Sequence, residues 1–156
     1  MESLLVITST DPVLNTLDFK PYRSTVERRV LPFVPGPDEP QTLQLQTTWG
    51  ALLTTKPGDM LISELETPND YWPIDAKIFE ESYEMIRPGY CIKRAITLLV
   101  PLTDLTGGDP DRIVTVESLE GPETVRAGDF YLAKGIKGEI WAYPKKKIEK
   151  VLMPVE

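Results

Sequence analysis

The chain contains one four-residue step twice, as Lys56-Pro57-Gly58-Asp59 and as Arg126-Ala127-Gly128-Asp129. In each copy a basic residue precedes a small residue and a Gly-Asp pair, and the two glycines stand 70 residues apart. Glycine supplies the backbone conformations that tight turns require, and aspartate accepts hydrogen bonds from the backbone of such turns. Each step therefore predicts a turn at the entrance of a strand, and its return predicts an internal duplication.

The sequence around the two steps repeats as well. A tryptophan follows each step, Trp72 in the first copy and Trp141 in the second, and these tryptophans stand 69 residues apart. Upstream, residues 43–50 and 114–121 both alternate apolar and polar side chains and then reach a glycine. Such alternation is typical of a half-buried strand that enters a turn.

These spacings place the first unit at residues 18–86 and the second at 87–156, after an N-terminal extension of residues 1–17. Two copies are too few for a solenoid, which needs about three or more units to bury its faces. We therefore expect one compact pseudo-symmetric domain. Its many short strands, 15 prolines and one helix per repeat predict a β-rich α+β fold. Each unit is expected to consist of short antiparallel strands with one short helix.

The first helix is expected to begin after Asp75, whose carboxylate can accept hydrogen bonds from free backbone amides. The apolar spacing extends it to about Ile86 and places Phe79 and Tyr83 on its buried face. The corresponding buried pair in the second unit is Ile148 and Leu152.

The charge and the cysteine content bound the class of protein. A formal net charge of −7 argues against a nucleic-acid-binding protein, because phosphate contacts require basic surface. Cys91 is the one cysteine, and the chain begins without a signal-peptide pattern, so we expect a cytoplasmic location. No stretch approaches the roughly 18 apolar residues of a membrane span.

The chain contains no histidine, which removes the Ser-His and Cys-His nucleophile pairs and the commonest transition-metal ligand. Asp59 and Asp129 are interpreted as turn residues rather than as a catalytic carboxylate pair. Asp104, Asp109 and Asp111 do not have the spacing of a calcium-binding loop. We therefore expect a non-enzymatic binding or accessory protein without a cofactor or metal.

The repeated motifs resemble the PGDYG family of short bacterial and phage proteins, which are named for a Pro-Gly-Asp-Tyr-Gly-like step. The second copy carries the resemblance in residues 114–121, 126–129 and 135–141, and the first copy carries it in residues 56–59 and 71–73. Neither copy has the full name motif, since Met60 and Phe130 stand at the aromatic position and the final glycine is absent. The resemblance implies the repeat unit and a bacterial or phage context, and it implies no particular activity.

An alternative hypothesis is a small-ligand-binding or sequestering protein with a pocket between the two units. Trp72 and Trp141 would stack on a nucleotide-like anionic ligand, and Lys134, Lys137 and Lys145 would supply positive charge. The tryptophans are also typical of packing between a sheet and a helix, and the lysines of a solvated face.

The remaining expected partner is a protein, and most simply a second copy of the chain in a symmetric homodimer. Ile92–Leu102 is the longest apolar run, and as a free sheet edge it would need a partner. The basic C-terminal part and the acidic remainder of the chain also offer complementary surfaces. A strand buried between the two units would explain the same apolar run.

Overall fold

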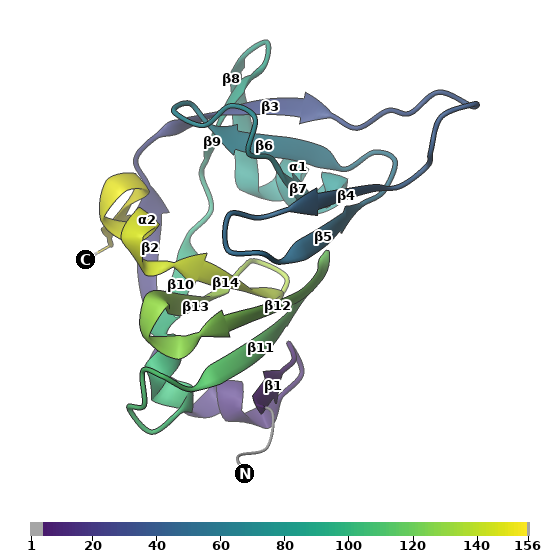
Figure 1. Cartoon of the computed structure of the whole chain (residues 1–156). Helices are drawn as coiled ribbons and strands as arrows, with labels where there is room; N and C mark the ends of the chain where they lie inside the picture. The colour runs from purple at the N-terminus through teal and green to yellow at the C-terminus, as the bar shows by residue number, and fades with distance from the viewer. Residues whose placement is uncertain (1–4, 156) are drawn as a thin grey trace. The chain divides into compact units, whose positions relative to one another are not determined.

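The computed structural model describes residues 5–155 and shows a β-rich fold with two α-helices and several sheets in that part of the chain (Figure 1). The chain divides into two compact units. The continuous unit is Val26–Ala95, and the discontinuous unit combines Met1–Thr25 with Ile96–Glu156. No helix within residues 5–155 is long and apolar enough to cross a membrane.

The continuous unit contains a five-stranded antiparallel sheet in the order β7-β6-β3-β9-β8, a two-stranded hairpin β4-β5 and the helix α1. Its elements are β3 (Glu27–Pro32), β4 (Leu43–Gln46), β5 (Leu52–Thr55), β6 (Met60–Glu64), β7 (Trp72–Ile74), α1 (Ala76–Ser82), β8 (Tyr83–Arg87) and β9 (Tyr90–Lys93).

The discontinuous unit contains a five-stranded antiparallel sheet in the order β14-β13-β10-β2-β15 and a three-stranded sheet in the order β1-β11-β12. Its strands and α-helix are β1 (Leu5–Ile7), β2 (Lys20–Ser24), β10 (Thr97–Pro101), β11 (Ile113–Ser118), β12 (Gly121–Arg126), β13 (Phe130–Lys134), β14 (Ile140–Pro144), α2 (Lys145–Val151) and β15 (Leu152–Pro154). Three short 3-10 helices complete it, at Pro12–Thr16, Leu102–Leu105 and Ala127–Asp129.

The compact units do not coincide with the expected segments 18–86 and 87–156. β2 pairs with β10 and β15 rather than with β3, the strand that follows it in sequence. β9 pairs with β3 and β8 instead of joining the strands that follow it. The boundaries therefore fall after Thr25 and after Ala95, in the connections that follow β2 and β9.

The apolar run Ile92–Leu102 is not one strand, and it is not a free edge. It divides into β9 and β10, and the backbone N–H groups of Arg94 and Ala95 in the break both donate to the carbonyl of Ser82, at 2.7 and 3.0 Å. β10 lies between β13 and β2, so Leu98-Leu99-Val100 is central in its sheet. The apolar character of this run reflects burial within its own sheet, which removes the expected reason for dimerisation through it.

The helix α1 begins as expected and ends earlier than expected. The Asp75 side chain accepts hydrogen bonds from the N–H groups of Lys77 and Ile78, and this confirms it as the N-cap. The helix ends at Ser82 rather than Ile86, because residues 83–87 form β8 and pair with β9.

The positions expected to be buried are confirmed except for Tyr83, which is half-buried and lies in β8 rather than in α1. Phe79 is buried and stacks on the ring of Tyr83 with 5.0 Å between centroids. Ile148 and Leu152 are buried in the discontinuous unit, as expected. The core of the continuous unit is formed by Val30, Ile62, Phe79 and Cys91, with partly buried neighbours Met60, Trp72, Ile74 and Tyr83.

Candidate functional site

The residues expected to bind an anionic ligand are distributed over both units. Trp72 begins β7 in the continuous unit. The other four lie in the discontinuous unit, where Lys134 ends β13, Lys137 lies in the turn after it, Trp141 lies in β14 and Lys145 begins α2. A ligand site that uses all five residues stays a prediction.

The pairing of β13 with β14 separates Lys134 from Trp141. Lys134 lies opposite Ile140, whereas Trp141 lies opposite Ala133. Because successive residues of a strand point to opposite faces of a sheet, Lys134 and Trp141 project from opposite faces of this hairpin. They therefore do not line one pocket on a single face of the sheet.

Two of the lysines make local contacts. The Lys134 ammonium lies 5.6 Å from the centroid of the Phe19 ring, which is within cation–π range. The backbone N–H of Lys137 donates to Oε1 of Glu139 at 2.8 Å, and the Glu139 carboxylate packs against Gly135, where it occupies the space that a Cβ atom would need. The Gly135–Gly138 segment is thus a hairpin turn, as expected, and its glutamate holds it closed.

Trp72 packs in the core of the continuous unit beside a buried ion pair. Arg28 is 4% exposed, its Nε donates to Oε1 of Glu64 at 3.0 Å, and its guanidinium carbon lies 5.5 Å from the centroid of the Trp72 ring. The strand register also places Arg28 opposite Cys91 on β9. The expected packing role of Trp72 is confirmed by its place against the apolar cluster of this unit.

Sequence reasoning missed the Arg28–Glu64 pair. The available signal was a pair of arginines inside an otherwise strand-like segment, followed by a glutamate at the end of the strand that lies beside it. The pair could not be assigned from the sequence, because the register that brings the two side chains together is a property of the sheet.

The expectation that Trp72 and Trp141 occupy equivalent positions in the two copies is wrong by one residue of strand register. Trp72 lies opposite Ile62, and the residue 70 positions after Ile62 is Leu132, which lies opposite Ala142. Trp141 is therefore one position away, on the other face of its strand. The two tryptophans lie in β7 and β14, which are outer strands of different sheets, and they point to different faces by this register.

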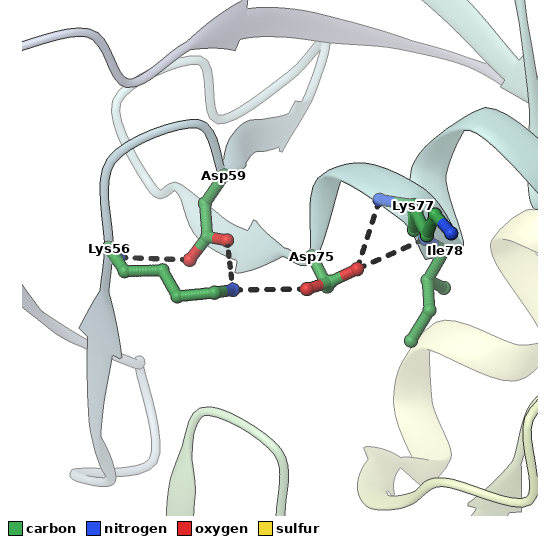
Figure 2. Close-up of polar contacts among 5 residues, drawn as sticks. All are labelled: Lys56, Asp59, Asp75, Lys77 and Ile78. Carbon is green, nitrogen blue, oxygen red and sulfur yellow. Dashed lines mark hydrogen bonds and ion pairs between the residues drawn. The ribbon is translucent and has the colours of Figure 1, made fainter.

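Lys56 is held between two carboxylates in the continuous unit (Figure 2). Its Nζ donates to Oδ1 of Asp59 at 2.5 Å and to Oδ2 of Asp75 at 3.1 Å. Asp59 is buried and its other oxygen accepts from the backbone N–H of Lys56 at 3.0 Å. The other oxygen of Asp75 caps α1. The lysine thereby connects the turn before β6 to the first turn of the helix.

This arrangement keeps the lysine charged. Partial burial opposes the charged form, but the hydrogen bonds to Asp59 and Asp75 and the charges of these carboxylates outweigh it, so the pKa of Lys56 is raised. The hydrogen bond from Lys56 lowers the pKa of Asp75 against the smaller opposing effect of burial. A nucleophilic lysine needs a lowered pKa. The site is therefore suited to a structural role rather than to amine chemistry.

The second Gly-Asp step carries a similar ion pair on the surface. Nη1 of Arg126 donates to Oδ1 of Asp129 at 3.1 Å, and its Nη2 donates to Oδ1 of Asp111 at 2.7 Å. Asp59 and Asp129 thus each bind the basic residue three positions earlier in their own unit. The expected turn role is confirmed for Asp59, which accepts from the backbone N–H of Lys56, whereas Asp129 contacts the Arg126 side chain. The glycines differ, since Gly58 has a φ of 90° whereas Gly128 lies in a 3-10 helix.

Cys91 is a buried thiol rather than an activated one. Burial raises its pKa to about 11, and the charge of Arg28 opposes this shift only in part. Thiolates are the reactive form of cysteine, so this side chain is protonated at neutral pH and inert.

The β4–β5 hairpin has a composition unlike the rest of the chain. Residues 41–55 contain no Asp, Glu, Lys or Arg, whereas residues 112–126, which span the β11–β12 hairpin, contain five. We name residues 41–55 the uncharged hairpin. Leu43 is 38% exposed and Leu52 is 52% exposed, and Gln44 and Gln46 are exposed beside them. Figure 1 shows the hairpin in dark blue after the long 33–42 connection.

A shallow groove of about 420 Å³ lies in the discontinuous unit and is lined by residues 16–18, 103–104 and 107–108. Asp18, at its rim, pairs with Lys20 at 2.9 Å. Among residues 5–155, no group of three or more histidine, cysteine, aspartate or glutamate side chains is placed to hold a metal ion.

Comparison with protein families, with characterised proteins and with solved structures finds no match to this chain. A functional hypothesis for this chain is therefore based on its own geometry.

Proposed function

We propose that the protein is a non-enzymatic binding protein and that the uncharged hairpin is its protein-binding surface. The observation that carries this proposal is the uninterrupted absence of charge over residues 41–55, combined with exposed leucines on both strands. Single exposed apolar residues are common on soluble proteins. A hairpin with an exposed face and no charged residue is unusual, because charges keep exposed strands from associating.

The distribution of reactive side chains supports binding over catalysis. Lys56 is held charged between two carboxylates, and Cys91 is buried with a raised pKa. Two groups that could act as nucleophiles without a histidine thus have structural surroundings.

We also propose that the binding surface belongs to one half of an internally duplicated protein. The two five-stranded sheets have corresponding orders, with β7, β6, β3, β9 and β8 matching β14, β13, β10, β2 and β15. Registers correspond too. Glu27 lies opposite Ile92 in one sheet, and Thr97 lies opposite Tyr22 in the other, each residue 70 positions from its counterpart. A chance likeness of short motifs would not extend to strand register.

On this interpretation the discontinuous unit is a circular permutation of the continuous one. In the continuous unit, β9 follows β8 in the chain and pairs with it. In the discontinuous unit, the matching strand is β2, which precedes the other strands of its sheet in the sequence and still lies between β15 and β10.

The binding proposal can be tested by photo-crosslinking in the cells that produce the protein. A photoreactive amino acid is placed at Leu52 in the uncharged hairpin and, in a matched control, at Glu80 on the exposed side of α1 in the same unit. We expect a discrete protein adduct from position 52 and none from position 80. The adducted partner should bind the pure protein, and Leu52→Lys should weaken that binding by at least about tenfold. Equal crosslinking from both positions, or none from position 52, would contradict the proposal.

A further inference from the structure

The edge of the uncharged hairpin differs from the corresponding edge in the discontinuous unit. β11 pairs with β12 on one side and with β1 on the other, and β1 runs parallel to it with Leu5 opposite Val114 and Ile7 opposite Val116. Within residues 5–155, β4 pairs with β5 alone. We name Leu43–Gln46 the β4 edge. The β4 edge corresponds to β11 of the β11–β12 hairpin. Within residues 5–155 it has no strand on its outer side, whereas β11 has β1.

The outer strands of the two five-stranded sheets carry features that discourage pairing. Proline lacks a backbone donor, and charged side chains at an edge repel an incoming strand. In the five-stranded sheets, the outer strands contain Pro73 in β7, Pro144 in β14, Pro154 in β15, and both Glu84 and Arg87 in β8. The β4 edge has neither proline nor charge. Its unpaired backbone groups are therefore open to another strand.

We propose that the β4 edge binds an extended, uncharged segment of a partner protein that adds a strand parallel to β4. This inference rests on the proposed function and specifies its binding mode. The chain itself shows the chemistry of such a segment, since β1 is the apolar sequence Leu5-Val6-Ile7 and its last side chain is 2% exposed. Main-chain hydrogen bonds supply the affinity of an added strand, and alternate side chains supply its specificity.

The side chains of the hairpin specify which residues the partner offers. Leu45 lies opposite the buried Leu53, and Leu43 lies opposite the buried Thr55, so the leucines of β4 share the inner face of the hairpin. Gln44 and Gln46 share the outer face with Thr54 and Leu52. An added strand would extend the inner row with apolar residues and the outer row with polar uncharged ones.

The test uses the full-length protein and, as its probe, a synthetic peptide with the sequence of residues 3–9, Ser-Leu-Leu-Val-Ile-Thr-Ser. Backbone amide signals are followed by NMR while the peptide is added up to millimolar concentration. We expect saturable shifts at residues 43–46. A peptide with proline in place of the central valine should bind at least about tenfold more weakly, because proline removes a ladder donor.

Two matched variants separate the edge from the rest of the hairpin. Gln44→Lys adds a charge to β4, and Thr54→Lys adds the same charge to its cross-strand neighbour on β5. We expect Gln44→Lys to weaken peptide binding by at least about tenfold and Thr54→Lys to change it by less than about threefold, because only the first charge stands at the edge. A spin label at the peptide N-terminus should broaden the Leu43 amide more than the Gln46 amide, and the reverse order would overturn the parallel direction.

Three other results would overturn the inference. The peptide could shift β11 and displace β1 while the signals of β4 stay unchanged. The protein could self-associate without peptide and lose that association in Gln44→Lys, which would identify the occupant as a second copy. Finally, Leu52→Lys could abolish binding of the crosslinked partner while Gln44→Lys leaves it intact. That last result would keep the proposed binding function and place it on the face of the hairpin, whereas the failure of crosslinking at position 52 would remove the binding function itself.

Discussion

Glu64→Gln should destabilise the continuous unit strongly, because it removes the charge that Arg28 faces in the core. The two side chains are 5% and 14% exposed and their charged atoms lie 3.0 Å apart. Removing one partner of a buried pair costs about 3–5 kcal/mol, because the other charge stays buried without compensation. Glu64 retains some contact with solvent, so we expect the lower end of this range, about 3 kcal/mol.

The double variant Arg28→Leu with Glu64→Gln is the control for this prediction. The residues 70 positions further on are Leu98 and Lys134, which also lie opposite each other, so the other sheet is stable without a buried pair here. Replacing both members of a buried pair by residues that need no counter-charge is often close to neutral. We expect the double variant to unfold within about 1 kcal/mol of the wild type, and thus to recover most of the loss seen in Glu64→Gln.

Urea unfolding followed by tryptophan fluorescence measures this free energy. A Trp141→Phe background leaves Trp49 and Trp72 as reporters, and both belong to the continuous unit. A loss of about 3 kcal/mol lowers the urea midpoint by about 1–3 M for typical urea dependences of small proteins. A loss below about 1 kcal/mol in Glu64→Gln, or a double variant that is less stable than the single one, would refute the assignment of a buried, mutually compensated pair.

Three further predictions concern the core, the helix cap and the thiol. Phe79→Ala should cost about 3–5 kcal/mol of unfolding free energy, because it removes a buried ring that stacks on Tyr83, and a loss below about 1 kcal/mol in urea unfolding would contradict its burial. Asp75→Ala should cost about 1 kcal/mol near neutral pH, since Asp75 caps α1 and holds Lys56. Because the pKa of Asp75 is lowered in the folded state, its stabilisation is present above its unfolded value of 3.8 and is lost as pH falls through the folded value. The difference between wild type and variant should therefore shrink in urea titrations below about pH 4, and a difference that grows there would reverse the sign of this linkage. Cys91, whose pKa is raised to about 11, should react with a maleimide at pH 7 only in urea, and rapid labelling of the native protein would show that the thiol is accessible.

Local features of the fold were readable from the sequence because their causes are local. Asp75 caps a helix through its own carboxylate, and Phe79 is buried because the helical period places it on the apolar side. The turn at Asp59 follows from the chemistry of a Gly-Asp step, since Gly58 has a positive φ and Asp59 accepts from the backbone N–H of Lys56. The β-rich character followed from many short strand-like segments between turn residues.

Strand partners were not readable, because pairing is a choice among distant segments. β2 and β9 have similar places in the repeated sequence, but each joins the sheet whose other strands come from the other expected repeat segment. A unit boundary after Thr25 or after Ala95 leaves the apolar–polar alternation of each strand unchanged. The periodicity of the sequence alone therefore does not locate the boundary. The same limitation explains Leu98-Leu99-Val100, whose apolar character is consistent with a free edge and with the centre of a sheet.

The candidate binding surface was only partly readable. The absence of charge over residues 41–55 is visible in the sequence, and it gained meaning once the structure showed that β4 is an outer strand with exposed glutamines. The expected tryptophan and lysine site depended on side-chain directions. Those directions depend on strand register, and a shift of one residue places Trp141 on the face opposite to Lys134.

The proposed duplication explains why one hairpin edge remains open. The segment that supplies β1 lies in the N-terminal extension, and the residues 70 positions later are Asp75, Ala76 and Lys77, which begin the helix α1. A helix cannot add a strand to a sheet, so residues 5–155 hold one segment of this kind for the two hairpins that the proposed duplication makes equivalent. In the discontinuous unit this segment pairs with β11, and the β11–β12 hairpin also contains charged residues. The continuous unit has no second segment to use, and its hairpin has no charges for protection. An edge without a binding role would be expected to carry charge or proline, as the outer strands of the two five-stranded sheets do. Its uncharged sequence is instead what a strand-binding edge requires, and this contrast is the basis for assigning it a partner.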